Sequence, residues 1–335
     1  MVNLNANAKN EVISMEKSQA GYLNKIIGAV VVAALFLLPF ILARFGQTGE
    51  FWIWVTTEMI ILALFATSLN LVLGFGGMVS FGHAAFFGVG AYTVALLMKK
   101  AGVSLLLALI AAPCAAGLAA AIIGWFCVRL IGLYFAILTL AFGQLLYMIA
   151  FQWYTFTGGD DGIHGIPKPE FLDPTNYYLL CLIIFLVCFL MMRMVVNSSF
   201  GLTIRLTREN LDRAKFIGIN VRRYQLINFI IAGVFAGIAG GLFTELNRFA
   251  QTEFLHWSRS GDAIFACLVG GMYSFVGPAI GSTILIFLHI ILQQIHQSLV
   301  EIWAIILGVI LLGVVLFAPE GLVGLYLKLT GKSET

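Results

Sequence analysis

The sequence predicts an all-α polytopic membrane protein with about ten transmembrane segments, two of them broken by glycine. Of its 335 residues, 61% are hydrophobic and only 10% are charged, whereas soluble domains carry about 25% charged residues. A helix needs about 20 apolar residues to cross the roughly 30 Å core of a bilayer. Eight apolar runs approach or exceed that length: 26–43, 51–73, 103–124, 131–152, 177–195, 224–246, 275–295 and 299–318.

The first run, residues 26–43, follows three lysines at positions 9, 17 and 25. A basic segment before an apolar run is also typical of a signal peptide. This run is long for a signal peptide and no A-x-A cleavage pattern follows it, so we expect a retained first helix. Residues 1–25 are then an N-terminal tail, residues 26–325 a single transmembrane domain, and residues 326–335 a C-terminal tail.

Two further apolar segments, residues 74–98 and 261–272, are interrupted by glycine. Residues 74–90 alone contain six glycines, which a continuous helix tolerates poorly. In transporters, interrupted spans near the middle of the bilayer expose backbone groups and helix ends to the substrate. We therefore expect a substrate path here, lined by polar side chains of this segment and of neighbouring spans: Ser68, Asn70, Ser80, His83, Thr139 and Gln144.

These polar residues also admit structural interpretations. A histidine inside a membrane is costly, but His83 could pack against a neighbouring carbonyl group instead of lining a path. A metal site is disfavoured because no second ligand lies at a suitable spacing. For Thr139 and Gln144, a structural hydrogen bond explains the residue as well as a position on the path does.

Residues 196–223 form a charged island that holds six of the nineteen Lys and Arg residues. By the positive-inside rule this loop is cytoplasmic. Counting spans outward from it places both termini in the cytoplasm and the acidic loop 153–176 outside. Lys99 and Lys100 also fall outside, against the rule.

Within the island, residues 203–217 fit one amphipathic helix. Ile204, Thr207, Leu211, Ala214 and Gly218 share a face at helical spacing. Glu209 and Arg213 are spaced as a favourable i,i+4 pair, and Gly218 is a plausible C-terminal cap. So short a helix is unstable alone in water, so it needs a surface to lie on. The competing interpretation is a solvated loop whose charges only fix orientation.

Small residues recur every four positions in two later spans. Such spacing permits close helix packing in lipid, so we expect helix contacts at Gly233, Gly237, Gly241, Gly277 and Gly281. The carboxylates Glu58, Glu245 and Glu301 fall near predicted span ends, where snorkelling or capping explains them. The segment 76–82 (GGMVSFG) is echoed at 270–277 (GGMYSFVG), and counting spans places both segments on the same side of the membrane.

Several chemistries are excluded. The five cysteines lie in or beside apolar runs without metal-ligand spacing. The GKS at 331–333 lacks the first glycine of a P-loop, since Tyr326 stands in its place. No HExxH motif or nucleophile elbow is present, and nothing supports nucleic-acid binding. We expect no cofactor, no metal and no catalytic residue in this chain.

Four stretches together resemble the LivM-type permeases of branched-chain amino acid ABC importers. They are SLNLVLGFGGMVSFGHAAFFGVGAY (68–92), YFAILTLAFGQ…TGGDDGIHGIP (134–167), the stretch GLTIRLTRENLDRAKFIGINVRRYQLINFIIAGVFAGIAGGL that begins at residue 201, and SGDAIFACLVGGMYSFVGPAIGS (260–282). The resemblance runs from about residue 51 to residue 325. The chain departs from the family pattern at Leu206, Thr207 and Gln225.

The resemblance implies a type II-like ABC importer permease in a bacterial inner membrane. Its implied partners are a second, LivH-type permease, two ATP-binding subunits that use ATP and Mg, and a periplasmic binding protein. It assigns the segment 201–218 to ATPase contact as a coupling helix, with these residues: Gly201, Arg205, Arg208, Glu209, Asp212, Arg213, Ala214 and Gly218.

The function expected is a non-catalytic transport subunit for branched-chain or related amino acids. Urea, amides and small aromatic or carboxylic acids are alternative substrates of the same importer class, and a homodimer of permeases is an alternative to a mixed pair. An ion-coupled secondary transporter would need carboxylates in the middle of the membrane, and an intramembrane enzyme would need a nucleophile–base or metal constellation.

Overall fold

The computed structural model describes residues 28–169, 172–295 and 302–329, and these are almost entirely helical. Eight helices in this part of the chain are long and apolar enough to span a membrane. They confirm the all-α polytopic class and the eight predicted runs: Gly28–Phe45, Gln47–Phe75, Leu105–Cys127, Leu133–Gln152, Pro174–Asn197, Val221–Asn247, Gly277–Ile295 and Trp303–Tyr326. The total of about ten crossings remains a prediction.

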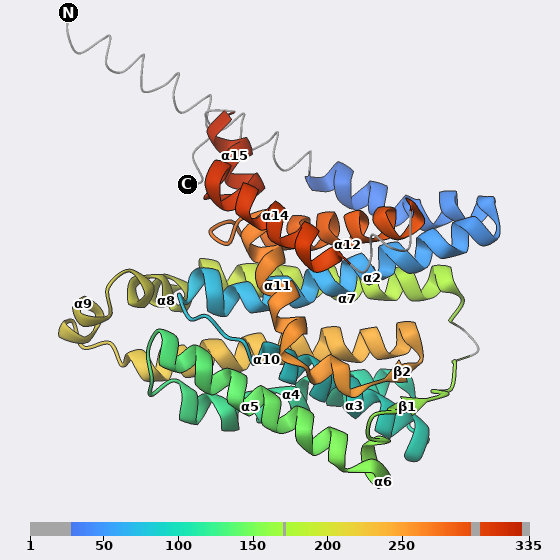
Figure 1. Cartoon of the computed structure of the whole chain (residues 1–335), viewed down its shortest axis with the longest axis horizontal. Coiled ribbons are helices and arrows are strands. Elements are labelled where there is room, and N and C mark those ends of the chain that lie inside the picture. Colours follow the sequence, from blue (N-terminus) through green and yellow to red (C-terminus); the bar gives the residue numbers. More distant parts are fainter. Residues whose placement is uncertain (1–27, 170–171, 296–301, 330–335) are drawn as a thin grey trace, which may run out of the picture.

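The helices form two layers (Figure 1). One layer contains α2 (Gln47–Asn70), α7 (Pro174–Asn197) and α12 (Gly277–Ile295), and the other contains α3 (His83–Lys100), α4 (Leu105–Cys127), α5 (Leu133–Gln152) and α10 (Val221–Asn247). The helix α11 (Trp257–Gly270) runs between the layers, and α14 (Trp303–Phe317) and α15 (Gly321–Leu329) lie beside α11 and α12.

One helix of each layer is central. The α2 span is 89% buried and the α10 span is 67% buried, whereas each of the other six spans is at most 39% buried. A helix that is apolar all round belongs inside a bundle, and α2 and α10 also pack on each other. The remaining spans present apolar side chains outward, as helices that face lipid or a partner do.

The first predicted break is confirmed. The helix α2 continues into a π-helical turn, η2 (Leu71–Phe75), after which residues 76–82 are not helical and α3 begins at His83. Gly77 has a φ of +66°, a conformation that side chains larger than glycine rarely adopt. The chain therefore returns from the end of α2 as irregular backbone before α3 starts.

The second predicted break, in residues 261–272, falls at its C-terminal end: α11 is helical up to Gly270, and residues 271–276 are irregular. Irregular backbone also precedes α11, where it includes strand β2 (Phe249–Ala250) and the 3₁₀-helix η3 (Thr252–Leu255). The helices that follow the two irregular segments, α3 and α11, meet at their first turns, where the Ala84 amide donates a 2.8 Å hydrogen bond to Ser260 Oγ.

The glycines expected at helix contacts lie against neighbouring helices of the same chain. A Cβ built on Gly233 or Gly237 would lie 2.5 Å or 2.3 Å from the Cβ of Ala120 or Ala116 on α4. Gly241 also faces α4 through Ala112, and Gly277 and Gly281 face backbone oxygens of the 266–271 segment. These close approaches bring α10 onto α4 and α12 onto α11.

The end of the bundle opposite the charged island is tied together by backbone contacts. Strand β1 (Ile163–His164) pairs antiparallel with β2, and a short helix, α6 (Tyr154–Thr157), lies beside it. Lys99 Nζ donates to the His164 carbonyl at 2.6 Å, and Lys100 Nζ donates to the carbonyls of Thr155 and Phe156. The two lysines that break the positive-inside pattern therefore bind carbonyl groups of this end.

Gly240→Ala should destabilise the bundle. Its Cβ would lie 1.8 Å from the Phe87 carbonyl oxygen, and backbone of α3 cannot yield without moving that helix. We expect a cost of about 1–3 kcal/mol, typical of overpacking, measured as earlier thermal unfolding in detergent. Gly308→Ala is the matched control, since nothing lies within 4 Å of its Cβ, and equal stability of the two variants would contradict the packing argument.

Candidate coupling site

The charged island folds as two helices, not one. They are α8 (Ser199–Glu209) and α9 (Leu211–Phe216). Asn210 separates them because its backbone is extended, with φ −155° and ψ 102°, and its side chain accepts a 2.9 Å hydrogen bond from the Arg213 amide. An asparagine in this position is a strong N-cap, and this corrects the prediction of one helix over 203–217.

Three of the five residues of the predicted apolar face are buried against the chain itself. Ile204, Thr207 and Ala214 are almost inaccessible to solvent, whereas Leu211 is half-buried and Gly218 is exposed; α8 packs on α7, α10 and η2. The surface that this short helix needs is therefore supplied by its own spans. Glu209 and Arg213 do not pair, because the break at Asn210 lies between them; the ion pair among the described residues is Lys215–Asp212, at 3.2 Å.

Arg208 joins α8 to both motif segments that echo each other in the sequence. Its Nη1 donates a 2.5 Å hydrogen bond to the carbonyl of Gly74 in η2. Its guanidinium also lies over the ring of Tyr273, 4.6 Å from the centroid, and a Cβ on Gly77 would lie 2.6 Å from Arg208 Cγ. We call this contact between α8, residues 71–77 and residues 271–276 the Arg208 junction.

Arg205 also faces the interior of the chain. Its Nη2 donates to the Val196 carbonyl at 3.1 Å, and its guanidinium lies 5.2 Å from the centroid of the Phe75 ring. Gly201 is needed beside it, because a Cβ there would lie 2.2 Å from the Val196 oxygen. Two arginines expected to meet an ATPase thus hold α8 onto the end of α7 and onto η2.

The remaining charged residues of the island point outward. Glu209, Asp212 and Arg213 are exposed. Beside them, Phe216 and Ile217 are 89% and 71% exposed at the end of α9. Gly218 follows with a φ of +87°, and its amide donates to the Lys215 carbonyl, which confirms it as the helix cap. The island therefore projects an exposed surface away from the bundle, with Phe216 and Ile217 at its tip and Glu209, Asp212 and Arg213 around them. We call this surface the knob.

Buried amides satisfy the backbone that the first break leaves unpaired. Asn228 Nδ2 donates to the Leu71 carbonyl at 2.7 Å, and Asn70 Nδ2 donates to the Ser274 carbonyl at 3.3 Å. Gly74 lies between them, with a built Cβ only 2.0 Å from the Met272 oxygen. Unsatisfied backbone groups are costly in a membrane; the Asn228 bond holds η2 onto α10, and the Asn70 bond holds the end of α2 against the 271–276 segment.

The other polar residues predicted for a substrate path lie in packed surroundings. His83 Nε2 is 3.0 Å from Ser68 Oγ, and the imidazole stacks on Phe65 with centroids 5.5 Å apart. Ser80 is fully buried near them in sequence, and among the described residues Ser80 Oγ and His83 Nδ1 have no hydrogen-bond partner. The partner of the His83 imidazole is thus the hydroxyl group of Ser68. A backbone carbonyl is the partner that the sequence suggested.

On α5, Thr139 Oγ1 bonds its own helix at the Ala136 carbonyl, 2.8 Å away. A Cβ on Gly82 would lie 2.0 Å from the Thr139 carbonyl oxygen, so α5 lies directly on the irregular segment 76–82. Gln144 follows one turn later, and its Oε1 is buried without a partner among the described residues.

Sequence reasoning missed four residues of this region: Asn228, Ser260, Tyr273 and Ser274. Asn228 stands inside an apolar span, so its cost in lipid was a usable signal, whereas Ser260 lies in the polar first turn of α11 and carried no such signal. Tyr273 and Ser274 belong to the echoed GGMYSFVG segment. The Arg208 junction brings this segment and GGMVSFG together, which agrees with the prediction that both lie on the same side.

The chain was compared with known proteins once this geometry was established. The family described as "Branched-chain amino acid transport system / permease component" matches residues 52–315. The high-affinity branched-chain amino acid permease protein LivM of Escherichia coli is 26% identical, over 89% of this chain and 76% of its own length. No solved structure matches the chain significantly.

Two other relatives match more partially. The probable branched-chain amino acid permease LivH of Methanocaldococcus jannaschii is 26% identical over 39% of this chain and 42% of its own. The autoinducer 2 import permease LsrC of Photorhabdus laumondii is 28% identical over 64% of both chains.

Arg208→Gln should loosen the first break. The variant loses a charge-assisted hydrogen bond, a type of bond that contributes about 1.5–3 kcal/mol, and the ring contact with Tyr273. Amide hydrogen exchange at residues 75–82 should therefore accelerate at least about tenfold. Arg213→Gln, an exposed arginine of the same island, is the control. Unchanged exchange at 75–82 in Arg208→Gln would show that the junction does not hold this segment.

Proposed function

Because the chain belongs to the branched-chain amino acid transport permease family, we propose that it is the membrane subunit of an ATP-driven importer of branched-chain or related amino acids. The observation that carries this proposal is the match to LivM along 89% of the chain. Residues 52–315, which match the family, contain the charged island (196–223) and both glycine-broken segments (74–98 and 261–272).

The substrate class follows from the extent of this similarity. Relatives named for autoinducer 2, guanosine and xylose match 64%, 37% and 27% of the chain, so membership of the wider group leaves the substrate open. The LivM match extends further along the chain than any of these. It supports an amino acid as the transported molecule.

The partners proposed are two ATP-binding subunits, a second LivH-type permease and a substrate-binding protein. ATP and Mg belong to the ATP-binding subunits in this proposal, and the permease itself performs no chemistry. The charged island faces the cytoplasm together with both termini, and the β1–β2 end faces the binding protein. This orientation rests on the six basic residues of the island.

The mechanism begins at the exposed knob of the island. An ATP-binding subunit would bury Phe216 and Ile217 and orient itself by the surrounding charges of Glu209, Asp212 and Arg213. Apolar groups surrounded by charges are typical of partner sites, with the charges fixing register. Movement of the subunit would displace α9 and with it α8, because only Asn210 separates the two helices and they contact each other.

The Arg208 junction would pass that displacement into the membrane. Arg208 holds the Gly74 carbonyl and lies over Tyr273, so a shift of α8 pulls on both irregular segments. These segments precede α3 and follow α11, the two short helices that meet inside the bundle. Interrupted helices commonly form the substrate sites of transporters, and rocking of one part of the bundle against another around such a site opens a path alternately to each side.

Reconstitution tests the function directly. Proteoliposomes that contain the assembled complex should accumulate labelled L-leucine only when ATP is inside the ATPase-facing compartment and the loaded binding protein is outside. Omission of either should reduce uptake to the background of protein-free liposomes. Uptake by this chain alone, without ATP, would identify a secondary transporter and overturn the proposal.

Replacement of Phe216 and Ile217 by Ser should weaken the hold of the ATP-binding subunits. Loss of two buried apolar side chains costs about 3–6 kcal/mol if both are fully covered in the complex, so co-purification should fall at least about tenfold. Membrane insertion should be unchanged. Ile131→Ser is the control, since Ile131 is 58% exposed and lies between α4 and α5, outside the island. Full co-purification of the double variant would contradict docking at the knob.

A further inference from the structure

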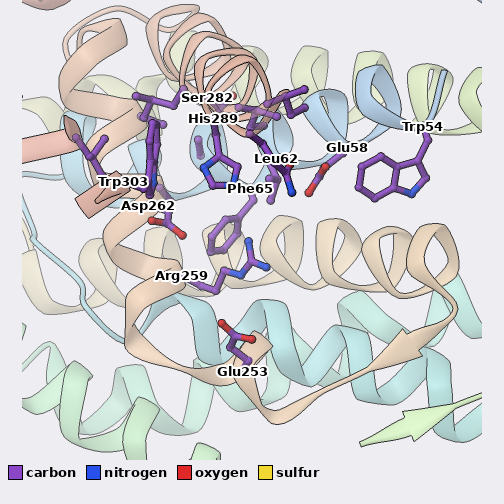
Figure 2. A pocket seen from close by; sticks show the side chains of 18 residues that line it. Trp54, Glu58, Leu62, Phe65, Glu253, Arg259, Asp262, Ser282, His289 and Trp303 are labelled. Atoms are coloured by element: carbon purple, nitrogen blue, oxygen red, sulfur yellow. The ribbon is translucent and has the colours of Figure 1, made fainter. Parts of the chain in front are cut away.

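A cavity of about 490 Å³ opens between α2, η3, α11, α12 and α14 (Figure 2). Its volume falls within the roughly 300–1,000 Å³ of small-molecule sites. None of the six polar residues that the sequence suggested for a substrate path lines it. Phe65 separates His83 from the cavity, since its ring stacks on the His83 imidazole and also forms part of the cavity wall.

Charged side chains of both signs face this cavity. Arg259 and Asp262 come from α11, Glu58 comes from α2, and Glu253 comes from η3. Glu58 lies near the middle of α2, which corrects the expectation that it sits at a span end. Ionisable groups at such depth are costly and mark substrate paths or internal pairs.

Arg259 acts electrostatically on Glu58 and Asp262 but lies within ion-pair distance of neither, since the one ion pair among the described residues is Lys215–Asp212 in the island. The guanidinium of Arg259 donates no hydrogen bond within the described part of the chain; it lies 5.4 Å and 5.9 Å from the ring centroids of Phe243 and Phe254. The rings fix its position by cation–π attraction and leave its N–H groups for another partner.

The position of Arg259 on its helix adds to the positive potential. It lies in the first turn of α11, which begins inside the bundle at Trp257. The amide groups of a helix N-terminus carry a partial positive charge of about half a unit. An Arg at that position is therefore suited to a carboxylate, while Glu58 and Asp262 across the same space are suited to an ammonium group.

Most of the remaining wall residues are apolar, while Ser282, His289 and Gln293 of α12 add polar groups. Leu62 and Phe65 come from α2, and the other apolar wall residues come from α11, α12 and α14: Ala263, Ala266, Leu285, Ile286, Ile290, Trp303 and Leu307. An aliphatic side chain would find close contacts with these apolar residues.

We propose that this cavity binds the zwitterionic head of an aliphatic α-amino acid on its way through the membrane. Arg259 takes the α-carboxylate, Glu58 and Asp262 take the α-ammonium, and the apolar walls take the side chain. The assignment rests on the proposed function, because it places the cargo of the importer within this subunit.

Binding to the assembled complex, measured without the binding protein, tests this site. Tritiated L-leucine should bind the wild-type complex, and 3-methylbutylamine and 4-methylpentanoate, which lack the carboxylate or the ammonium, should compete at least about tenfold less well. Arg259→Gln should weaken leucine binding at least about tenfold and remove the preference for leucine over 3-methylbutylamine. Glu58→Gln should remove the preference over 4-methylpentanoate.

The preference ratios do not depend on how much of a variant folds, so loss of protein cannot imitate the expected result. Glu50→Gln is the matched control, since Glu50 lies on the same helix, exposed and outside the cavity. Absence of leucine binding, or unchanged preferences in both variants, would overturn the site. If the wild-type complex nevertheless imports leucine, only the site fails; if it imports no amino acid, the proposed function fails with it.

Discussion

Backbone groups inside a membrane must find hydrogen-bond partners within the protein, and the two breaks in this bundle depend on that constraint. Asn228 binds the first break at Leu71, and Ser260 accepts a hydrogen bond from the Ala84 amide in the first turn of its neighbour α3. Arg208 binds the break from outside the spans, at Gly74. Irregular backbone is thus stable here only because side chains of distant segments bind it.

The same arrangement links the ends of the molecule. A side chain that satisfies a break also connects that break to its own helix, so α8 cannot move freely of residues 71–77 and 271–276. The two short helices beyond the breaks meet at Ala84 and Ser260, and the charged cavity lies on the far face of α11. A displacement at the island has a continuous route of contacts to the wall that carries Arg259.

Much of this could be predicted from the sequence, because length and hydropathy determine apolar spans and glycine determines breaks. The helix boundary at Asn210 was missed, since the i,i+4 pattern continues across it and only the capping preference of asparagine opposes the pattern. The contacts of Arg208 with Gly74 and Tyr273 were missed because a positive charge in a loop is expected to be solvated. Glu58 and Arg259 are far apart in the sequence, so their shared cavity required the packing of α11 against α2.

In the proposed mechanism, Arg208 transmits the work of ATP hydrolysis to the broken spans. We would test this first by measuring the number of leucine molecules imported per ATP hydrolysed by proteoliposomes that contain the Arg208→Gln complex. Hydrolysis should continue while this ratio falls at least about tenfold, since the loss of about 1.4 kcal/mol of coupling free energy corresponds to a factor of ten. A ratio equal to that of the wild-type complex would show that Arg208 does not carry the coupling.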